Sequence, residues 1–189
     1  MSSSRPFVSL SARQAASITF LALVLFQGFH ELEHIVQVIQ RFVLGIANGA
    51  GIVGAYFDAV PVHFFYNTVF LALLVLTYVR LGMNRPEGRQ QYGALTFYLL
   101  TFAVVFQSWH ELEHVAKLVQ YFALNHNNAV GGILAIGTGA ILPLFNNTWL
   151  HFWYNTIAYA PIVAAYFASG IYRQLASDLG HVERRWSGN

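Results

Sequence analysis

The sequence predicts an all-α integral membrane protein, a four-helix bundle built from two repeated helical hairpins with pseudo-twofold symmetry. Three observations predict this class. Only 10% of the 189 residues are Asp, Glu, Lys or Arg and 56% are hydrophobic, whereas soluble domains carry about 25% charged residues. Four apolar stretches each reach the length of about 20 residues that a helix needs to cross the hydrocarbon. Finally, two sequence motifs occur twice along the chain, which indicates an internal repeat.

The four apolar stretches are the predicted membrane spans. They cover about 15–44, 60–81, 93–124 and 147–172. The first and third are longer than a bilayer requires, so we expect them to tilt or to project beyond it. We treat residues 1–189 as a single membrane domain, with repeat one at about 15–82, repeat two at about 93–172 and a tail at 173–189.

The basic residues gather on one side of the predicted spans. That side holds Arg5, Arg13, Arg80, Arg85, Arg89, Arg173, Arg184 and Arg185. Only Arg41 and Lys117 fall on the other side. The positive-inside rule therefore places both termini in the cytoplasm, and we expect a bacterial-type inner membrane. No basic cluster indicates nucleic acid as a partner, so membrane lipid is the expected surrounding.

The repeat consists of two motif pairs. Residues 26–34, FQGFHELEH, reappear at 106–114 as FQSWHELEH, and residues 63–68, HFFYNT, reappear at 151–156 as HFWYNT. The first pair is offset by 80 residues and the second by 88, so the second half has a longer outer loop. Two hairpins of the same orientation predict a pseudo-twofold axis along the membrane normal.

These motifs hold most of the ionisable groups within the spans, and such groups usually mark a functional site. At about 1.5 Å rise per residue they converge at one depth, in the outer half of the membrane. The predicted metal ligands are His30, Glu31, Glu33, His34, His63, His110, Glu111, Glu113, His114 and His151. The side chains predicted either to orient these ligands or to join the helices are Gln27, Gln107, Tyr66, Asn67, Tyr154 and Asn155.

The motif at 30–34 and 110–114 resembles three known patterns. As His-Glu-x-x-His it resembles the zinc metalloprotease signature. As Glu-x-x-His it resembles the helix motif of di-iron carboxylate proteins. As His-x-x-x-His it resembles one histidine box of membrane desaturases and hydroxylases, although the further His-x-x-His-His boxes of that family are absent. A protease needs one asymmetric site, whereas a di-metal site uses both copies, so the duplication favours the di-metal site.

Charge and ligand chemistry predict the metal. Four ionised glutamates in a low-dielectric interior need neutralisation, and two divalent ions provide it. The chain has no cysteine, so thiolate ligands are excluded and the motifs offer nitrogen and oxygen atoms. These suit iron, which we favour, while zinc, manganese and copper also fit. The predicted function is therefore a metal-dependent oxidoreductase, an oxidase or hydroxylase that acts on a lipid-soluble substrate or quinone.

Several alternatives stay open at this point. Histidines on neighbouring helices can also ligate a b-type haem in a quinone-reactive electron carrier, although the glutamates would repel haem propionates. A non-catalytic subunit of a larger complex, a metal-ion carrier or a proton relay would use the same groups. The outer loops at 45–59 and 125–146 are apolar. We expect them to fold back as a lid or to pack against other membrane subunits.

Overall fold

The computed structural model describes residues 11–47, 49–54, 59–126, 132–133, 147–173 and 175–177. These residues are mostly helical and include no strand, which confirms the all-α part of the predicted class. The long helices are α1 (Ala12–Val38), α3 (Val60–Arg80), α4 (Pro86–Ala123) and α6 (Asn147–Ala168). Most of the predicted tail and of the second outer loop, together with Arg5, Arg184 and Arg185, lies outside the described residues.

Three helical segments are long and apolar enough to cross a membrane, which indicates a membrane protein. They are Ala12–Val43, Val60–Arg80 and Pro86–Ala123. Helix α6 has 22 residues but is not among them. A fourth span, the side on which the termini lie and the type of membrane therefore stay predictions.

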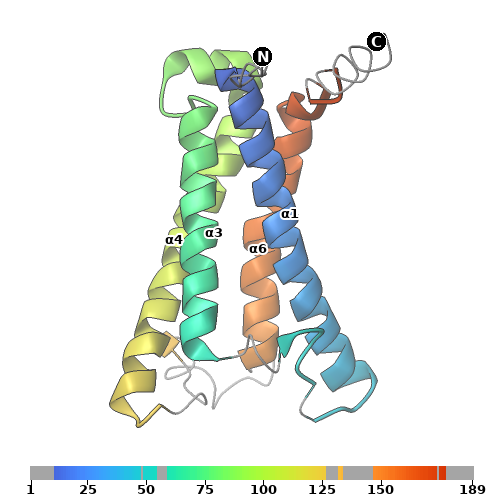
Figure 1. Ribbon diagram of the computed structural model, residues 1–189, viewed down its shortest axis with the longest axis vertical. Coiled ribbons are helices and arrows are strands. Elements are labelled where there is room, and N and C mark those ends of the chain that lie inside the picture. Colours follow the sequence, from blue (N-terminus) through green and yellow to red (C-terminus); the bar gives the residue numbers. More distant parts are fainter. Residues whose placement is uncertain are drawn as a thin grey trace, which may run out of the picture.

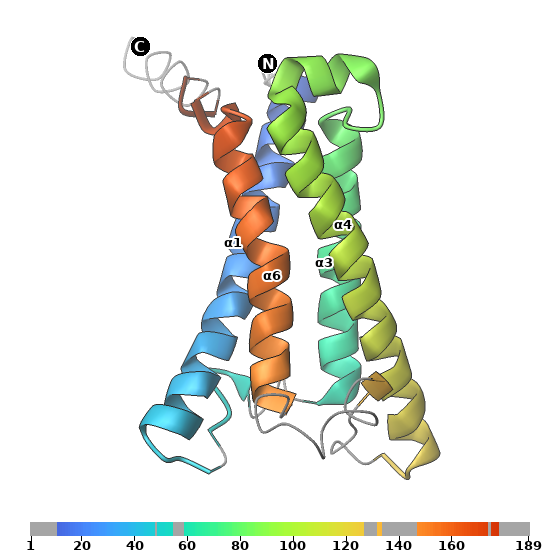
Figure 2. The same cartoon turned by 180° about the vertical axis from the view of Figure 1, so that it is seen from behind.

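The four long helices lie side by side along the long axis of the molecule (Figures 1 and 2). Helix α1 packs against α3 and α6, and α4 packs against the same two helices. The start of α1 and the end of α6 lie at the same end of the molecule (Figure 1). At the opposite end, where the outer loops begin, α1 and α4 splay apart (Figure 2).

The helix boundaries follow from local sequence. Ser11 caps α1 by accepting a hydrogen bond from the Gln14 backbone N–H at 3.1 Å, while the Gln14 side chain accepts one from the Ser11 N–H at 3.0 Å, which is a capping box. A proline lies within the first two residues of both α3 and α4, where its missing N–H costs nothing. Helix α1 continues into a short π-helix, η1 (Ile39–Val43). Helix α4 is kinked at Gly93, whose φ of 84° suits glycine.

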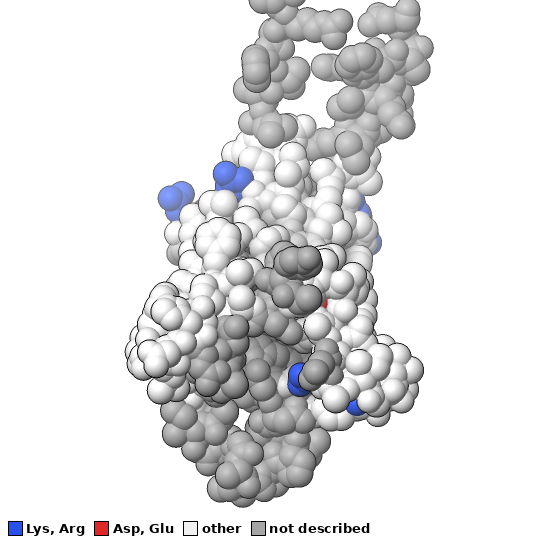
Figure 3. Space-filling view, turned by 60° about the horizontal axis from the view of Figure 1, so that its bottom comes forward, with Lys and Arg blue, Asp and Glu red and all other residues white. Residues whose placement is uncertain are grey.

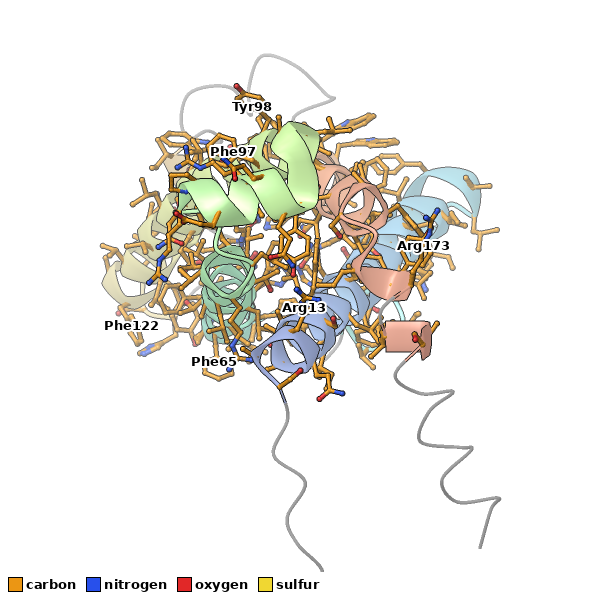
Figure 4. The ribbon with its side chains drawn as sticks, turned by 90° about the horizontal axis from the view of Figure 1, so that it is seen from above. Arg13, Phe65, Phe97, Tyr98, Phe122 and Arg173 are labelled. Carbon is orange, nitrogen blue, oxygen red and sulfur yellow. The ribbon has the colours of Figure 1, made fainter. Side chains whose placement is uncertain are left out.

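The end of the molecule that holds the start of α1 has an apolar core. Side chains from all four helices are fully buried there, among them Phe20, Phe70, Leu100 and Ile162. Other large apolar and aromatic side chains point outward, and Phe65, Tyr98 and Phe122 lie at the periphery in the view from this end (Figure 4). The described surface in the view toward the loop end is also mostly uncharged, with isolated Lys and Arg side chains and a small area of Asp or Glu (Figure 3). An apolar exterior suits contact with lipid.

Candidate metal centre

The interior changes character toward the loop end, where histidines replace the apolar core. Each of the four long helices contributes to a cluster that consists of His30, His34, His63, His110, His114 and His151. Five of these side chains are buried and His63 is half-buried. The structure thus brings together all six histidines of the repeated motifs.

The first half of the chain supplies one compact group of three imidazoles. The nearest ring nitrogens of His30 and His34, both Nε2, are 3.2 Å apart. The ring of His63 lies 5.0 Å from that of His30 and 5.5 Å from that of His34. One ligand atom from each of the three lies within 4.8 Å of the others. Bound zinc sits about 2.0–2.1 Å from imidazole nitrogen, so small side-chain movements would suffice to hold an ion.

A second group of three links the two halves. It consists of His63, His114 and His151, whose ligand atoms again lie within 4.8 Å of one another. The rings of His63 and His114 are 5.2 Å apart, as are those of His63 and His151. His63 therefore belongs to both groups. Among the described residues, neither group includes a carboxylate.

Two tyrosines pack against the cluster at matching positions of the repeat. The ring of Tyr66 stacks on that of His30 at 4.2 Å, and the ring of Tyr154 lies 4.4 Å from that of His110. The Tyr66 hydroxyl donates to a backbone carbonyl of α1, and the Tyr154 hydroxyl accepts a hydrogen bond from Trp109 at 3.0 Å. These contacts hold the two imidazole rings in position.

Two pairs of buried amides lie in the adjacent turns of the helices. Gln27 donates to Asn155 at 2.8 Å, and Gln107 donates to Asn67 at 3.1 Å. Each asparagine also donates to the backbone carbonyl of the histidine four residues before it. Both amide pairs join one half of the chain to the other. These four side chains therefore form helix–helix hydrogen bonds, one of the two roles that the sequence predicts for them.

The carboxylates of Glu33 and Glu113 are directed at the outer loops. Glu33 accepts hydrogen bonds from the backbone N–H groups of Ile52 at 2.9 Å and Val53 at 3.1 Å. Glu113 accepts one from the N–H of Ile133 at 3.0 Å. The described parts of both loops therefore fold back onto the helices that carry the histidine motifs.

Glutamine side chains add a second attachment for each loop. The amide of Gln40 accepts from the N–H of Gly51 at 2.8 Å and donates to its carbonyl at 3.1 Å. Gln120 makes the same pair of bonds to Gly132, at 3.0 and 3.2 Å. Sequence reasoning missed both glutamines, although they recur at the 80-residue offset of the first motif.

The remaining two carboxylates, Glu31 and Glu111, lie between helices. Glu31 on α1 accepts from Thr156 on α6 at 2.6 Å, and Glu111 on α4 accepts from Thr68 on α3 at 2.6 Å. The second oxygen of each carboxylate is buried and makes no hydrogen bond within the described part of the chain. Both threonines close the repeated HFFYNT and HFWYNT motifs, which was the available signal for them.

The two halves differ at one position beside the cluster. Gln37 in the first half corresponds to Lys117 in the second at the 80-residue offset. The Gln37 Oε1 atom lies 2.9 Å from Nδ1 of His34. The Nζ atom of Lys117, whose side chain is only 4% exposed, lies 3.0 Å from Nε2 of His151. The cluster thus contains a cation in its second half and a neutral amide in its first.

Comparison of the chain with family models, with curated proteins and with solved structures found no match. The fold and the site are therefore the evidence for its function. Together these define a helical protein with apolar helices that are able to cross a membrane. They also define buried histidine groups that could hold a metal ion.

Proposed function

We propose that the protein is a membrane-embedded metal-dependent oxidoreductase whose buried histidines hold a transition-metal ion. The observation that carries the proposal is the presence of three-histidine groups with ligand atoms within 4.8 Å of one another. Neutral imidazole is a good ligand for iron, zinc, nickel and copper. Three protein ligands leave a coordination position open for an oxidant or a substrate.

The proposed architecture is a four-helix bundle of two hairpins related by a pseudo-twofold axis, with four spans and cytoplasmic termini. The ring of helix contacts supports it, since α1 and α4 each pack against both α3 and α6. Matched hydrogen bonds support the symmetry. The bond from Gln27 to Asn155 has its counterpart in the bond from Gln107 to Asn67. The loop contacts of the two halves match in the same way.

We propose copper as the metal. The sequence favoured iron with glutamate ligands, as in a di-iron carboxylate centre. The glutamates, however, accept hydrogen bonds from loop amides and from threonines, which supports a ligand set of nitrogen alone. Copper binds such ligands more tightly than the other divalent metals of its row, and unlike zinc it changes oxidation state. Ligation by the glutamates stays a prediction.

The substrate that we propose is a lipid-soluble reductant, such as a reduced quinone, with oxygen as the oxidant. The site lies within helices whose outer faces are apolar, which supports access from the bilayer. The metal, when bound, would supply the redox chemistry. Tyr66 and Tyr154 hold the imidazoles of His30 and His110 by ring contacts, and so fix the geometry of the histidine cluster.

Haem is the competing cofactor, and the spacing of the imidazoles argues against it. The Nε2 atoms of His30 and His34 face each other at 3.2 Å, and those of His110 and His114 at 3.1 Å. A planar macrocycle between such closely packed rings would have to displace most of the cluster. A visible spectrum with a Soret band would restore the haem alternative.

Metal analysis of purified protein tests the proposal. We expect copper to remain bound to the wild-type protein in detergent after loading and desalting, and to be lost from His34→Ala. His126→Ala is the matched control, because His126 is exposed and belongs to neither histidine group. Absence of copper from the loaded wild type would refute the metal site. Bound copper without oxygen consumption in the presence of a reduced short-chain quinone would refute the oxidoreductase activity alone.

A further inference from the structure

We infer that the centre holds a single metal ion, bound by His30, His34 and His63, and that Lys117 keeps the second half from binding another. This inference rests on the proposed function and specifies the place and number of the ions. It replaces the two ions that the sequence predicted with an asymmetric arrangement, in which a lysine side chain stands at the second position.

The first half presents its histidine nitrogens for binding. The Gln37 amide donates to the Ala50 carbonyl at 3.4 Å, so its Oε1 atom is the one that faces Nδ1 of His34, at 2.9 Å. An amide oxygen only accepts, so Nδ1 of His34 carries the hydrogen and the lone pair lies on Nε2. That Nε2 atom accepts a hydrogen bond from Nε2 of His30 at 3.2 Å, and a shift of the His30 hydrogen to its Nδ1 atom would free both Nε2 atoms for an ion. The tautomer that Gln37 selects is therefore the one that directs a lone pair into the cluster.

In the second half, the side chain of Lys117 directs a hydrogen-bond donor at His151 instead. Lys117 Nζ lies 3.0 Å from Nε2 of His151, and an ammonium group has donors but no lone pair. Nε2 of His151 must therefore accept the hydrogen bond, which occupies its lone pair. The contact is buried, because Lys117 and His151 are 4% and 9% exposed. A lysine thus takes the place that a metal ion would need.

The grouping of the histidines follows the same asymmetry. The repeat predicts that His110, His114 and His151 form the counterpart of the first group, but the second group in the described residues contains His63 in place of His110. The rings of His110 and His151 are 6.2 Å apart. The equivalent rings of the first half are 5.0 Å apart. Because one neutral imidazole has one lone pair, the shared His63 serves one ion only.

Electrostatics also favours one ion. Neither histidine group among the described residues contains a carboxylate, since the glutamates of the motifs bond to loops and to threonines. The Glu113 carboxylate already attracts the Lys117 cation, so a second divalent ion beside that cation would add positive charge to a low-dielectric interior without a carboxylate of its own. Uncompensated buried charge is strongly unfavourable.

Exchanging the side chains at positions 37 and 117 between the two halves tests this inference. Copper per chain would be measured by elemental analysis after loading and desalting, with Arg173→Gln as the control because that exposed residue lies beyond the end of α6, far along the chain from His151. We expect about one ion per chain for the wild type and the control. Lys117→Gln, which gives the second half the side chain of the first, should raise this to about two. Gln37→Lys should lower it at least tenfold.

Single histidine variants provide a second measurement that does not depend on folding of the Lys117 variant. We expect His30→Ala to lose the ion and His110→Ala to retain it, with size-exclusion profiles confirming that both variants are folded. Two ions per wild-type chain, an unchanged value in folded Lys117→Gln, or equal losses in the two histidine variants would each overturn the single-ion inference. Complete absence of copper from the wild type would instead refute the proposed function.

Discussion

The two ends of the helix assembly are built from the same four helices but have opposite interiors. At one end, side chains such as Phe20, Phe70 and Leu74 are fully buried in an apolar core. At the other end the interior contains six imidazoles, and the surrounding hydrogen bonds come from amides, carboxylates and loop backbone. Packing at the first end can therefore hold the helices in position while the second end contains groups that are costly to bury.

The largest expected effect is on the apolar end. Phe70→Ala removes a fully buried ring, so we expect a loss of about 3–5 kcal/mol in the free energy of unfolding. Copper bound per folded chain should not change. Phe65→Ala is the matched control on the same helix, since that side chain is 67% exposed. Thermal unfolding in detergent measures the stability of both variants. A loss of copper from folded Phe70→Ala would contradict the separation of roles between the two ends.

A smaller effect is expected where the first outer loop meets the histidine end. Gly51 has a φ of 84°, and a Cβ atom there would collide with the Glu33 carboxylate. Gly51→Ala should therefore favour opening of the loop by about 2 kcal/mol, measured as faster hydrogen exchange at the amides of Ile52 and Val53. Gly45→Ala separates strain from collision, because Gly45 also has a positive φ, of 68°, but nothing within 4 Å of the added carbon. Equal exchange in both variants would refute the role of the Glu33 contact.

The smallest effect concerns the charge on the loop contact. Glu33→Gln keeps an acceptor for the Ile52 amide but removes the negative charge, so we expect the loop contact to weaken by about 1 kcal/mol. Hydrogen exchange at Ile52 measures this loss, and copper content should match that of the wild type. Loss of copper from this variant would restore Glu33 as a metal ligand, as the sequence predicted.

The sequence predicts the helices closely because their apolar runs are bounded by charged or polar residues, glycine and proline. The predicted span at 60–81 corresponds to α3, Val60–Arg80. The third span is predicted to begin at residue 93, whereas α4 begins at Pro86 and is kinked at Gly93. The polar segment before Gly93 is helical because proline starts it. It lies across the end of the assembly and is not part of the apolar run (Figure 1).

The candidate site is predictable where it depends on repetition and helix geometry, and unpredictable where it depends on distant partners. Equal depth and recurrence bring the six histidines together. The directions of Glu31 and Glu33 depend on Thr156 and on the loop amide of Ile52, which no local pattern connects to the motif. The contact between Lys117 and His151 joins two different helices, α4 and α6, so the spacing of residues within one helix does not predict it.

The amide bonds between the halves have a consequence for how the chain assembles. Gln27 of the first half donates to Asn155 of the second, and Gln107 of the second donates to Asn67 of the first. A lone hairpin would expose these donors to hydrocarbon, where an unsatisfied polar group costs several kcal/mol. Each half of the chain therefore supplies the hydrogen-bond acceptor that the buried glutamine of the other half needs. The short connection between α3 and α4 keeps the two pairs of helices at high effective concentration, so each pair meets the partners of its buried amides within one chain.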